Sequence, residues 1–292
     1  PMGKIVGGFW MPHDPVMFVA PDAPPLAQRE AVWAAYEACA ERLAALQPTS
    51  VIIVGCDHYI LFGTHCLPRY VIGTGDVDGP IDRLPGLERG AVRNHQALAA
   101  HIVEHGDGQG VDWTVARSFT VDHSFSIPHQ LVVKPAEALL GRELPSIPVY
   151  LACGVDPYIS LQRSADLGRQ LRAAVEAFDA DERVVIIGSG GISHWVGTAE
   201  MGRVAEDFDR EILALGVNGD LQALCAYRDE DILRRAGNGA MEIRNFACAL
   251  AAIERPQGEV IAYEAVPAWV TGLGFVQLSV RAEHEPCITL PT

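Results

Sequence analysis

Two apolar runs constrain the fold of this chain more than any other feature. Residues 50–55 (SVIIVG) and 183–188 (RVVIIG) are rich in β-branched side chains, and each run ends in glycine. Runs without a polar face are typical of strands buried on both sides of a parallel sheet. Residues 25–46 and 159–178 carry apolar side chains at three- and four-residue steps, the spacing of amphipathic helices. This alternation predicts an α/β fold, a three-layer sandwich around a largely parallel, mixed sheet.

The rest of the chain continues the same alternation. Residues 73–89 are rich in Gly, Asp and Pro and are expected to form a loop. The 292-residue sequence shows no internal repeat and no low-complexity linker, so we expect a single domain over residues 1–292. Further strands are expected at residues 4–11, 69–73, 112–116, 147–153, 259–266 and 274–280, with helices at 91–105 and over most of 200–250.

The acidic composition argues against nucleic acid as a partner. The formal net charge is -15, and the sequence has no Lys/Arg cluster that could displace counterions from a phosphate backbone. No apolar stretch is long enough to cross a membrane and no secretory signal is visible, so we expect no membrane association. The seven cysteines, an odd number without C-x-x-C spacing, are interpreted as reduced thiols of a cytoplasmic protein.

Three histidines occupy equivalent positions after predicted strands. His13, His58 and His194 each lie in the loop that follows a buried apolar run. Ligand sites of open α/β sheets gather at the carboxyl ends of strands, so these side chains can converge although they are far apart in sequence. A single histidine in such a place is more often a capping or core residue, but three of them favour a site. Glycines beside two of them would let the backbone approach a ligand closely.

Histidines without a cysteine pattern suggest a particular metal chemistry. Two histidines and one carboxylate on one face of an octahedron are typical of non-haem Fe(II) oxygenases. Such a face leaves three positions open, which the two oxygens of a catechol and one O2 molecule can occupy. The spacing does not select the carboxylate, because the chain has 37 acidic residues.

The motifs around these residues resemble a known family, the class III extradiol dioxygenases, which includes the protocatechuate 4,5-dioxygenase catalytic subunit and gallate dioxygenase. The resemblance implies Fe(II) as cofactor, O2 as co-substrate and ring cleavage next to the two hydroxyls of a small aromatic substrate. It favours a carboxylated catechol such as protocatechuate, gallate or a methylgallate. The matching segments, in the family's order, are GGFWMPHDP, GCDHY, DHSFSIPHQ, GSGGISHW, GNGAMEIRNF and YEAVPAWVTGLGF.

The resemblance also implies roles for individual residues. It assigns the iron to His13, His58 and Glu242, and it makes His194 the residue that accepts and returns a proton. His123 corresponds to a second histidine of the pocket, on the side of O2 and substrate.

Further residues lie near the predicted site. Thr271 lies where related enzymes place a hydroxyl near the substrate carboxylate. His129 could share the pocket with His123, or it could form a structural hydrogen bond. The tryptophans Trp10, Trp195 and Trp269 each lie beside a predicted site residue, where they could hold a planar substrate or belong to the core.

A competing motif lies at residues 101–105, HIVEH, which matches the H-x-x-E-H helix of some zinc peptidases. A glycine-rich segment, residues 106–110, follows at once, so the motif would occupy the last turn of a helix, where histidines commonly complement exposed carbonyls. Ser189 and Ser193 lack the G-x-S-x-G spacing of a hydrolase elbow, and Ser189 is expected to be a turn residue. The peptidase and hydrolase interpretations are therefore disfavoured.

Several alternatives stay open after the resemblance is considered. The substrate could be an aminophenol or an uncarboxylated catechol. The chain could be a non-catalytic binding protein of the same fold, or a zinc hydrolase that uses the same histidines. As in some relatives, a small partner subunit could cover the pocket, so we expect a homodimer or a heteromer with such a subunit.

Overall fold

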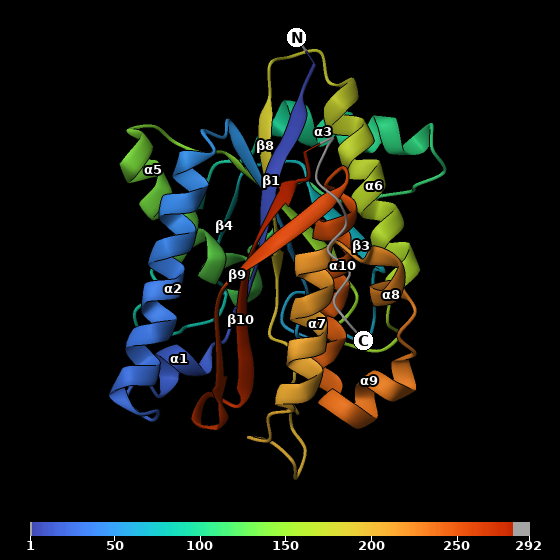
Figure 1. Ribbon diagram of the computed structural model, residues 1–292. Helices are drawn as coiled ribbons and strands as arrows, with labels where there is room; N and C mark the ends of the chain where they lie inside the picture. Colours follow the sequence, from blue (N-terminus) through green and yellow to red (C-terminus); the bar gives the residue numbers. More distant parts are fainter. Residues whose placement is uncertain (1, 283–292) are drawn as a thin grey trace.

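An eight-stranded mixed sheet forms the centre of the computed structural model, which describes residues 2–282 (Figure 1). Its four central strands are parallel to one another, and antiparallel neighbours flank them on either side. In sheet order the strands are β6 (Thr114–Ala116), β3 (Tyr70–Gly73), β7 (Ser146–Leu151), β2 (Ser50–Gly55), β8 (Arg183–Ser189), β1 (Lys4–Met11), β10 (Thr271–Val280) and β9 (Pro256–Val266).

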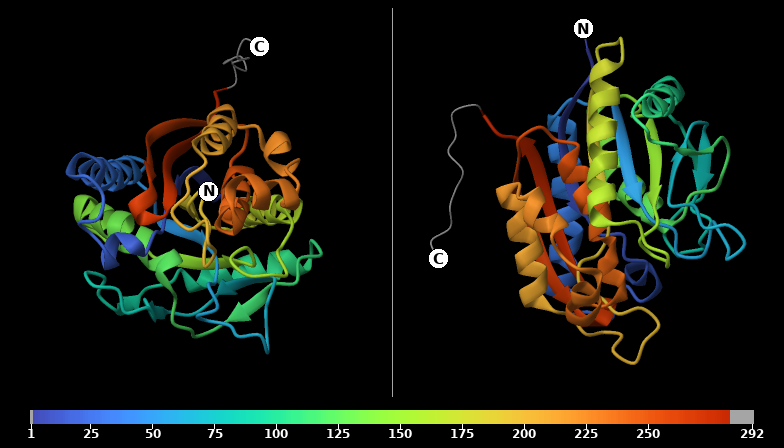
Figure 2. Two further views of the ribbon diagram at one scale, coloured as in Figure 1. Left: turned by 90° about the horizontal axis from the view of Figure 1, so that it is seen from below. Right: turned by 90° about the vertical axis from the view of Figure 1, so that its right-hand side faces the viewer.

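Helices cover both faces of this sheet, as the two apolar clusters and the views in Figures 1 and 2 show. One layer contains α1 (Val16–Val19), α2 (Leu26–Ala45), α4 (His123–Pro128), the π-helix η1 (His129–Val133) and α5 (Lys134–Leu140). The other layer contains α3 (Gln96–Asp107), α6 (Leu161–Ala177), α7 (Glu206–Asn218), α8 (Leu221–Cys225), α9 (Asp229–Ala236), the 3-10 helix η2 (Asn238–Glu242) and α10 (Ile243–Ala251).

The central strands face both layers because successive side chains point to opposite sides of a sheet. Val51 and Ile53 of β2 pack in the α2 layer, whereas Ile52 and Val54 pack in the α6 layer. All six residues of β2 are buried. The predicted three-layer α/β fold with a largely parallel sheet is therefore confirmed.

Two local differences from the sequence prediction have tertiary causes. The segment predicted as a loop contains β4 (Val77–Gly79), which pairs with β5 (Gly90–Val92) in a separate two-stranded sheet. Because β5 includes residues 91 and 92, these residues are not part of the helix that was predicted at residues 91–105. The helix begins later, after His95, whose Nδ1 accepts the backbone N–H of Leu98 as an N-terminal cap.

The neighbouring strands β2, β8 and β1 end at the same edge of the sheet. Met11 pairs in register with Ser189, and Val54 pairs with Gly188. The loops after β1, β2 and β8 therefore leave the sheet side by side. Within residues 2–282, no helix combines the length and apolar character that crossing a membrane requires.

Close packing between α6 and α10 fixes the helix that directly follows Glu242. All nine residues of α10 are buried. Gly168 of α6 lies against the backbone of α10, and a Cβ at Gly168 would overlap the carbonyl oxygen of Cys248. The two helices can approach this closely only because position 168 has no side chain.

This contact predicts a large effect from a single methyl group. Gly168→Ala should lower the free energy of unfolding by about 1–3 kcal/mol, because the added Cβ overlaps backbone that cannot move aside easily. Urea unfolding followed by circular dichroism measures this change. Gly90→Ala is the control, because a Cβ there meets no atom within 4 Å, and it should change stability by less than about 0.5 kcal/mol. Equal stability of the two variants would contradict the packing argument.

Candidate functional site

Three histidines from the three neighbouring loops meet one carboxylate. Oε1 of Glu242, the last residue of η2, lies 3.1 Å from Nε2 of His13 and 3.3 Å from Nε2 of His58. Nε2 of His194 lies farther away, 3.8 Å from the same oxygen. The structure thus brings together residues that the sequence separates by up to 229 positions.

The partners of the Nδ1 atoms indicate that His13 and His58, the two predicted ligand histidines, each carry a proton on Nδ1. Nδ1 of His13 lies 2.8 Å from Oγ of Ser189, whose own proton is donated to the backbone carbonyl of Ser124. Nδ1 of His58 lies 2.9 Å from a carboxylate oxygen of Asp122, which can only accept. Both imidazoles therefore donate through Nδ1, which leaves Nε2 of each ring facing Glu242. Burial lowers the pKa of His58, but the bonds to Asp122 and Glu242 outweigh it and raise this pKa well above its usual value, so without a metal a proton supplies the positive charge at Nε2.

The neutral Nδ1–H tautomer of both rings makes the contact with Glu242 unfavourable unless a positive charge lies between the groups. A carboxylate oxygen and two imidazole lone pairs are all acceptors, and here they face one another at 3.1 to 3.3 Å. A bound metal cation satisfies all three atoms at once. The donor set, two imidazole nitrogens and one carboxylate oxygen, suits Fe(II) and also suits zinc.

Glu242 is held as an anion although it is only 3% exposed. Burial raises the pKa of Glu242, but positive charge at His13 and His194 and hydrogen bonds from His13 and His58 outweigh it, so the pKa lies well below its usual value. A metal cation at the same place would act in the same direction. The second oxygen of Glu242, Oε2, accepts the backbone N–H of Gly191 at 2.8 Å. A Cβ at Gly191 would press on Thr271 and the ring of His194, so glycine is needed in this part of the GSGGIS segment.

Asp122 holds His58 in place from behind. It is completely buried, and its Oδ1 accepts hydrogen bonds from the Tyr150 hydroxyl and from Ser124. Burial opposes ionisation of Asp122, but the bond with His58 outweighs it, so the pKa of Asp122 lies below its usual value. Asp122 is the first residue of the DHSFSIPHQ segment that carries the family resemblance, but the sequence analysis assigned no role to it.

Cys56 also lies near the predicted ligands. Its Sγ is 3.8 Å from Oε1 of Glu242. One possible ligand atom of each of four residues, His13, Cys56, His58 and Glu242, lies within 4.8 Å of the other three. The contact with Cys153, together with burial, raises the pKa of the Cys56 thiol well above its usual value. In the absence of a metal the thiol is therefore protonated.

His194 is oriented differently from the two predicted ligand histidines. Its Nδ1 donates to the backbone carbonyl of Ile192 at 3.1 Å, which leaves the lone pair on Nε2 directed at the site. Burial lowers the pKa of His194, so the ring is a neutral base. The preceding residue, Ser193, is tied through both its backbone N–H and its hydroxyl to the buried carboxylate of Asp209, which sequence analysis did not single out.

His123 lies against His58, with the two rings stacked at a centroid distance of 4.3 Å. Nδ1 of His123 is 2.6 Å from Oδ2 of Asp82, and the same oxygen accepts the backbone N–H of His123. Asp82 lies in the segment that the sequence marked only as a loop. Asp82 thus orients the ring of His123 through a carboxylate hydrogen bond at Nδ1, as Asp122 does for His58.

A cavity of about 300 Å³ opens onto these groups. Its walls contain every residue that the sequence assigned to the site, including Thr271, the first residue of β10. The volume lies at the small end of ligand pockets, about 300–1,000 Å³, and suits a molecule with a single aromatic ring. Asp14 also lines the cavity, and burial raises the pKa of its carboxyl to about 8.

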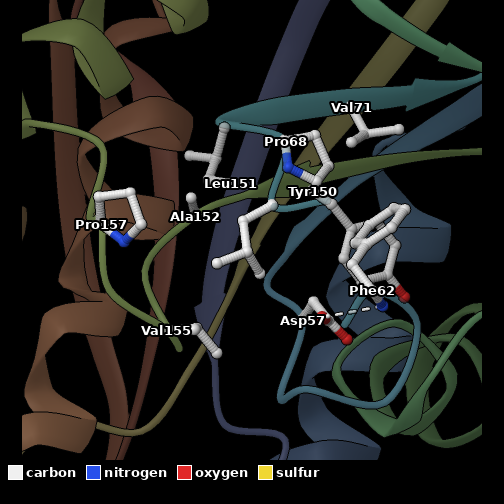
Figure 3. Close-up of a pocket in the computed structure, with 10 residues that line it drawn as sticks. Asp57, Phe62, Pro68, Val71, Tyr150, Leu151, Ala152, Val155 and Pro157 are labelled. Atoms are coloured by element: carbon white, nitrogen blue, oxygen red, sulfur yellow. Dashed lines mark hydrogen bonds between the residues drawn. The ribbon is translucent and has the colours of Figure 1, made fainter. Parts of the chain in front are cut away.

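A second cavity beside the His58 loop is far smaller, about 20 Å³ (Figure 3). It has room for about one water molecule and cannot hold an aromatic ring. Asp57 on its wall accepts the backbone N–H groups of Ile60, Leu61 and Phe62, which shapes the loop after His58. This cavity thus belongs to the framework of the loop.

The tryptophans beside the predicted site have different surroundings. Trp195 lines the larger cavity. Trp10 is completely buried and stacks on Phe246 at a centroid distance of 4.7 Å, and Trp269 is also completely buried. Core packing therefore accounts for Trp10 and Trp269, and Trp195 alone of the three faces the cavity.

The H-x-x-E-H motif lies in the second half of α3, with His105 in the last turn and His101 one turn earlier, because the helix continues through Gly106 to Asp107. Neither histidine lines the cavity. The rings of His101 and His105 are 6.0 Å apart, His101 lies against Phe178, and His105 contacts Gln170. Within residues 2–282, no acidic or thiol side chain completes a metal-binding group with them. The motif has the surroundings of a helix terminus.

One protein-family model matches most of the chain. The family model described as the catalytic LigB subunit of aromatic ring-opening dioxygenase matches residues 7–274. The chain therefore belongs to this family, the class III extradiol dioxygenases, as the motifs indicated. It is a dioxygenase of the aromatic ring-opening class.

Individual relatives support the family over nearly the whole chain. The 2,3-dihydroxyphenylpropionate/2,3-dihydroxicinnamic acid 1,2-dioxygenase of Photorhabdus laumondii is 23% identical over 90% of this chain and 94% of that enzyme. The Escherichia coli enzyme of the same name is 26% identical over 84% of this chain and 89% of its own length. A crystal structure of an uncharacterized protein from Escherichia coli K12 covers 93% of this chain and 99% of that chain with a TM-score of 0.59 and 14% identity, which shows the same fold.

His129 lies outside the cavity walls. It is 5% exposed, and its ring stacks on Phe125 at a centroid distance of 5.5 Å. Burial and the nearby charge of Lys134 lower the pKa of His129 to about 3. The surroundings of His129 are those of a neutral core residue.

Burial of neutral His129 makes stability depend on pH. The unfolded chain binds a proton at this residue below about pH 6.5, whereas the folded chain does so only near pH 3, so the free energy of unfolding falls as the pH drops between these values. His129→Gln should flatten this dependence by about 1 kcal/mol per pH unit between pH 6 and 4. Urea unfolding at several pH values measures the slope. The control is His65→Gln at an exposed position, which should keep the wild-type slope of unfolding free energy against pH. If His129→Gln shows the same slope as His65→Gln, folded His129 accepts a proton and the argument is wrong.

Proposed function

We propose that this chain is an Fe(II)-dependent extradiol dioxygenase that inserts both atoms of O2 into a catechol-type aromatic. One observation carries the proposal: the Nε2 atoms of His13 and His58 and a carboxylate oxygen of Glu242 face one another at the wall of a cavity sized for one ring. Two imidazoles and one carboxylate are the donor set of non-haem Fe(II) oxygenases. Family membership makes aromatic ring opening the reaction that this site serves.

His13, His58 and Glu242 would hold the iron. When bound there, Fe(II) supplies the electronic link between a chelated catechol and O2, which cannot react directly at a useful rate. The protein confines the three reactants to one small cavity. Apolar lining residues such as Val16, Val270 and Met201 keep water away from them.

His194 is placed to move the protons of the reaction. Its Nε2 carries the lone pair and faces the cavity, so it can take the proton of a catechol hydroxyl and return it when the ring opens. His123, fixed by Asp82, can hydrogen-bond an oxygen atom on the other side of His58. Neither role requires these two histidines to contact the metal.

The predicted carboxylate on the substrate has weak support in the cavity. Thr271 lines the wall, and its hydroxyl lies 3.4 Å from the backbone carbonyls of Ser193 and Gly272. The relatives are named for substrates with a propionate or cinnamate side chain, but sequence identities of 23% and 26% do not carry a substrate over. The proposal therefore specifies a catechol-type ring and leaves aminophenols within the test.

Three further expectations accompany this proposal. Residues 1–292 are proposed to form one catalytic domain, supported by the family match over residues 7–274. The chain is proposed to work in the cytoplasm, and as a homodimer or with a small partner subunit, as in some relatives. Size measurement of the purified protein by light scattering tests the assembly.

Reconstitution with Fe(II) under anaerobic conditions tests the activity. Addition of O2 with catechol, protocatechuate, gallate or 2-aminophenol should lead to oxygen uptake and a visible absorbance of a ring-opened product with at least one of them. His13→Ala and Glu242→Gln should lose bound iron and oxygen uptake together, whereas His105→Ala should keep both. Tight zinc binding with hydrolysis and without oxygen uptake would instead support the zinc hydrolase.

His194 gives a sharper test because it lies beside the proposed ligands. His194→Phe should keep one iron per chain but lower turnover by about 10²- to 10⁴-fold, because the proton acceptor is lost and the donor set is intact. Iron content by atomic absorption and oxygen uptake separate the two effects. His129→Gln is the matched control outside the cavity and should keep both; loss of iron in His194→Phe would place His194 among the ligands.

A further inference from the structure

The larger cavity offers no cationic side chain to a ligand. Its walls contain two carboxyl groups, Asp14 and Glu242, and no lysine or arginine of residues 2–282 lines them. The carboxylates of Asp82 and Asp122 lie next to the ring of His123, so the charge near the cavity is negative. A positively charged contact for a substrate carboxylate is therefore missing from the part of the chain that the structure describes.

The arginines nearest in sequence are occupied elsewhere. Arg203 stacks its guanidinium on the ring of Trp195 at 4.7 Å, but it pairs with Glu200 at 2.8 Å and is mostly solvent-exposed. Arg244, two residues after Glu242, pairs with Asp229 at 2.5 Å. Neither guanidinium belongs to the cavity wall.

The neutral groups of the wall are also poor partners for an anion. The hydroxyl of Thr271 is the one hydroxyl among the described lining residues, and backbone carbonyls are its nearest acceptors. One neutral hydrogen bond does not offset the desolvation of a carboxylate.

A bound metal does not remove this difficulty. The charge of a metal held by His13, His58 and Glu242 would be met by Glu242 and by the catechol oxygens. Apart from the histidines and carboxyl groups, the wall contains apolar side chains, among them Val16, Val196 and Met201. A ring substituent that points away from the metal therefore enters surroundings that favour uncharged groups.

We infer that this cavity selects catechols whose other ring substituents are uncharged, and that it binds carboxylated catechols weakly. The inference rests on the proposed function, because it takes the catechol oxygens to lie at His13, His58 and Glu242. It differs from the names of the relatives, whose substrates carry a carboxylate. The substrate class that follows includes catechol itself and its alkyl, hydroxyl and amide derivatives.

Matched ligand pairs test the inference by binding, independently of turnover. The Fe(II)-loaded protein is titrated without oxygen with 2,3-dihydroxyphenylpropionate and with its amide, and in parallel with protocatechuate and its amide, by isothermal titration calorimetry. Each amide should bind at least about tenfold more tightly than its acid, because only the acid brings an unpaired charge into the cavity. Equal or tighter binding of the acids, or no binding of either amide, would overturn the inference.

A charge introduced at the cavity rim should reverse the preference. Val196 lines the cavity and is 52% exposed, so a lysine there can reach the ligand without being buried. In Val196→Lys, the dissociation constant of each acid divided by that of its amide should be about tenfold smaller than in the wild type. Val196→Gln has a side chain of similar length without a charge, and it should leave this ratio unchanged. An unchanged ratio in Val196→Lys would count against the electrostatic cause.

Oxygen uptake measured with the same ligands separates this inference from the proposed function. Tighter binding of the amides without oxygen uptake would support the cavity preference and contradict the dioxygenase proposal. Oxygen uptake together with tighter binding of the acids would support the dioxygenase proposal and contradict the cavity preference.

Discussion

The contact between the Glu242 carboxylate and the Nε2 atoms of two imidazoles is the feature on which the rest of this structure depends. Acceptors facing acceptors at 3.1 and 3.3 Å repel one another unless a proton or a metal cation joins them. The protein nevertheless holds this arrangement in a buried place, with the N–H of Gly191 on the free carboxylate oxygen and the tightly packed α10 directly behind. The fold thereby keeps an anion ready where burial alone would have neutralised it.

The orientation of the histidines comes from a set of acceptors spread over the chain. Ser189, Asp122 and Asp82 each take the Nδ1 proton of a histidine, and a backbone carbonyl does so for His194. In every case Nε2 is left for the cavity. All four histidines are therefore oriented in the same way. The proposed ligands His13 and His58 differ from the proposed proton carrier His194 only in their position relative to Glu242.

Different residues of the cavity wall bear on the two parts of the proposed function. The family match shows the reaction class, aromatic ring opening, and a fold shared at only 14% identity shows how much sequence change the framework tolerates. Val196 and Met201 line the cavity but are not among the proposed metal ligands. We therefore propose that separate groups of residues set the reaction class and the substrate class, and similarity to relatives bears mainly on the reaction class.

The sequence by itself determined the layered fold, because apolar runs such as residues 50–55 can only be buried between two helical layers, and the strands so predicted are found. It also pointed to His13, His58 and His194, because each follows such a strand, and motif resemblance singled out Glu242 and His123. Only the tertiary structure decided the acceptors Asp122 and Asp82, the pairing of β4 with β5, and the absence of a cation from the cavity wall within residues 2–282. These features arise where segments that are distant in sequence come into contact. A hydrogen bond between two such segments, or the lack of a charge between them, produces no periodic pattern or characteristic spacing in the sequence of either segment.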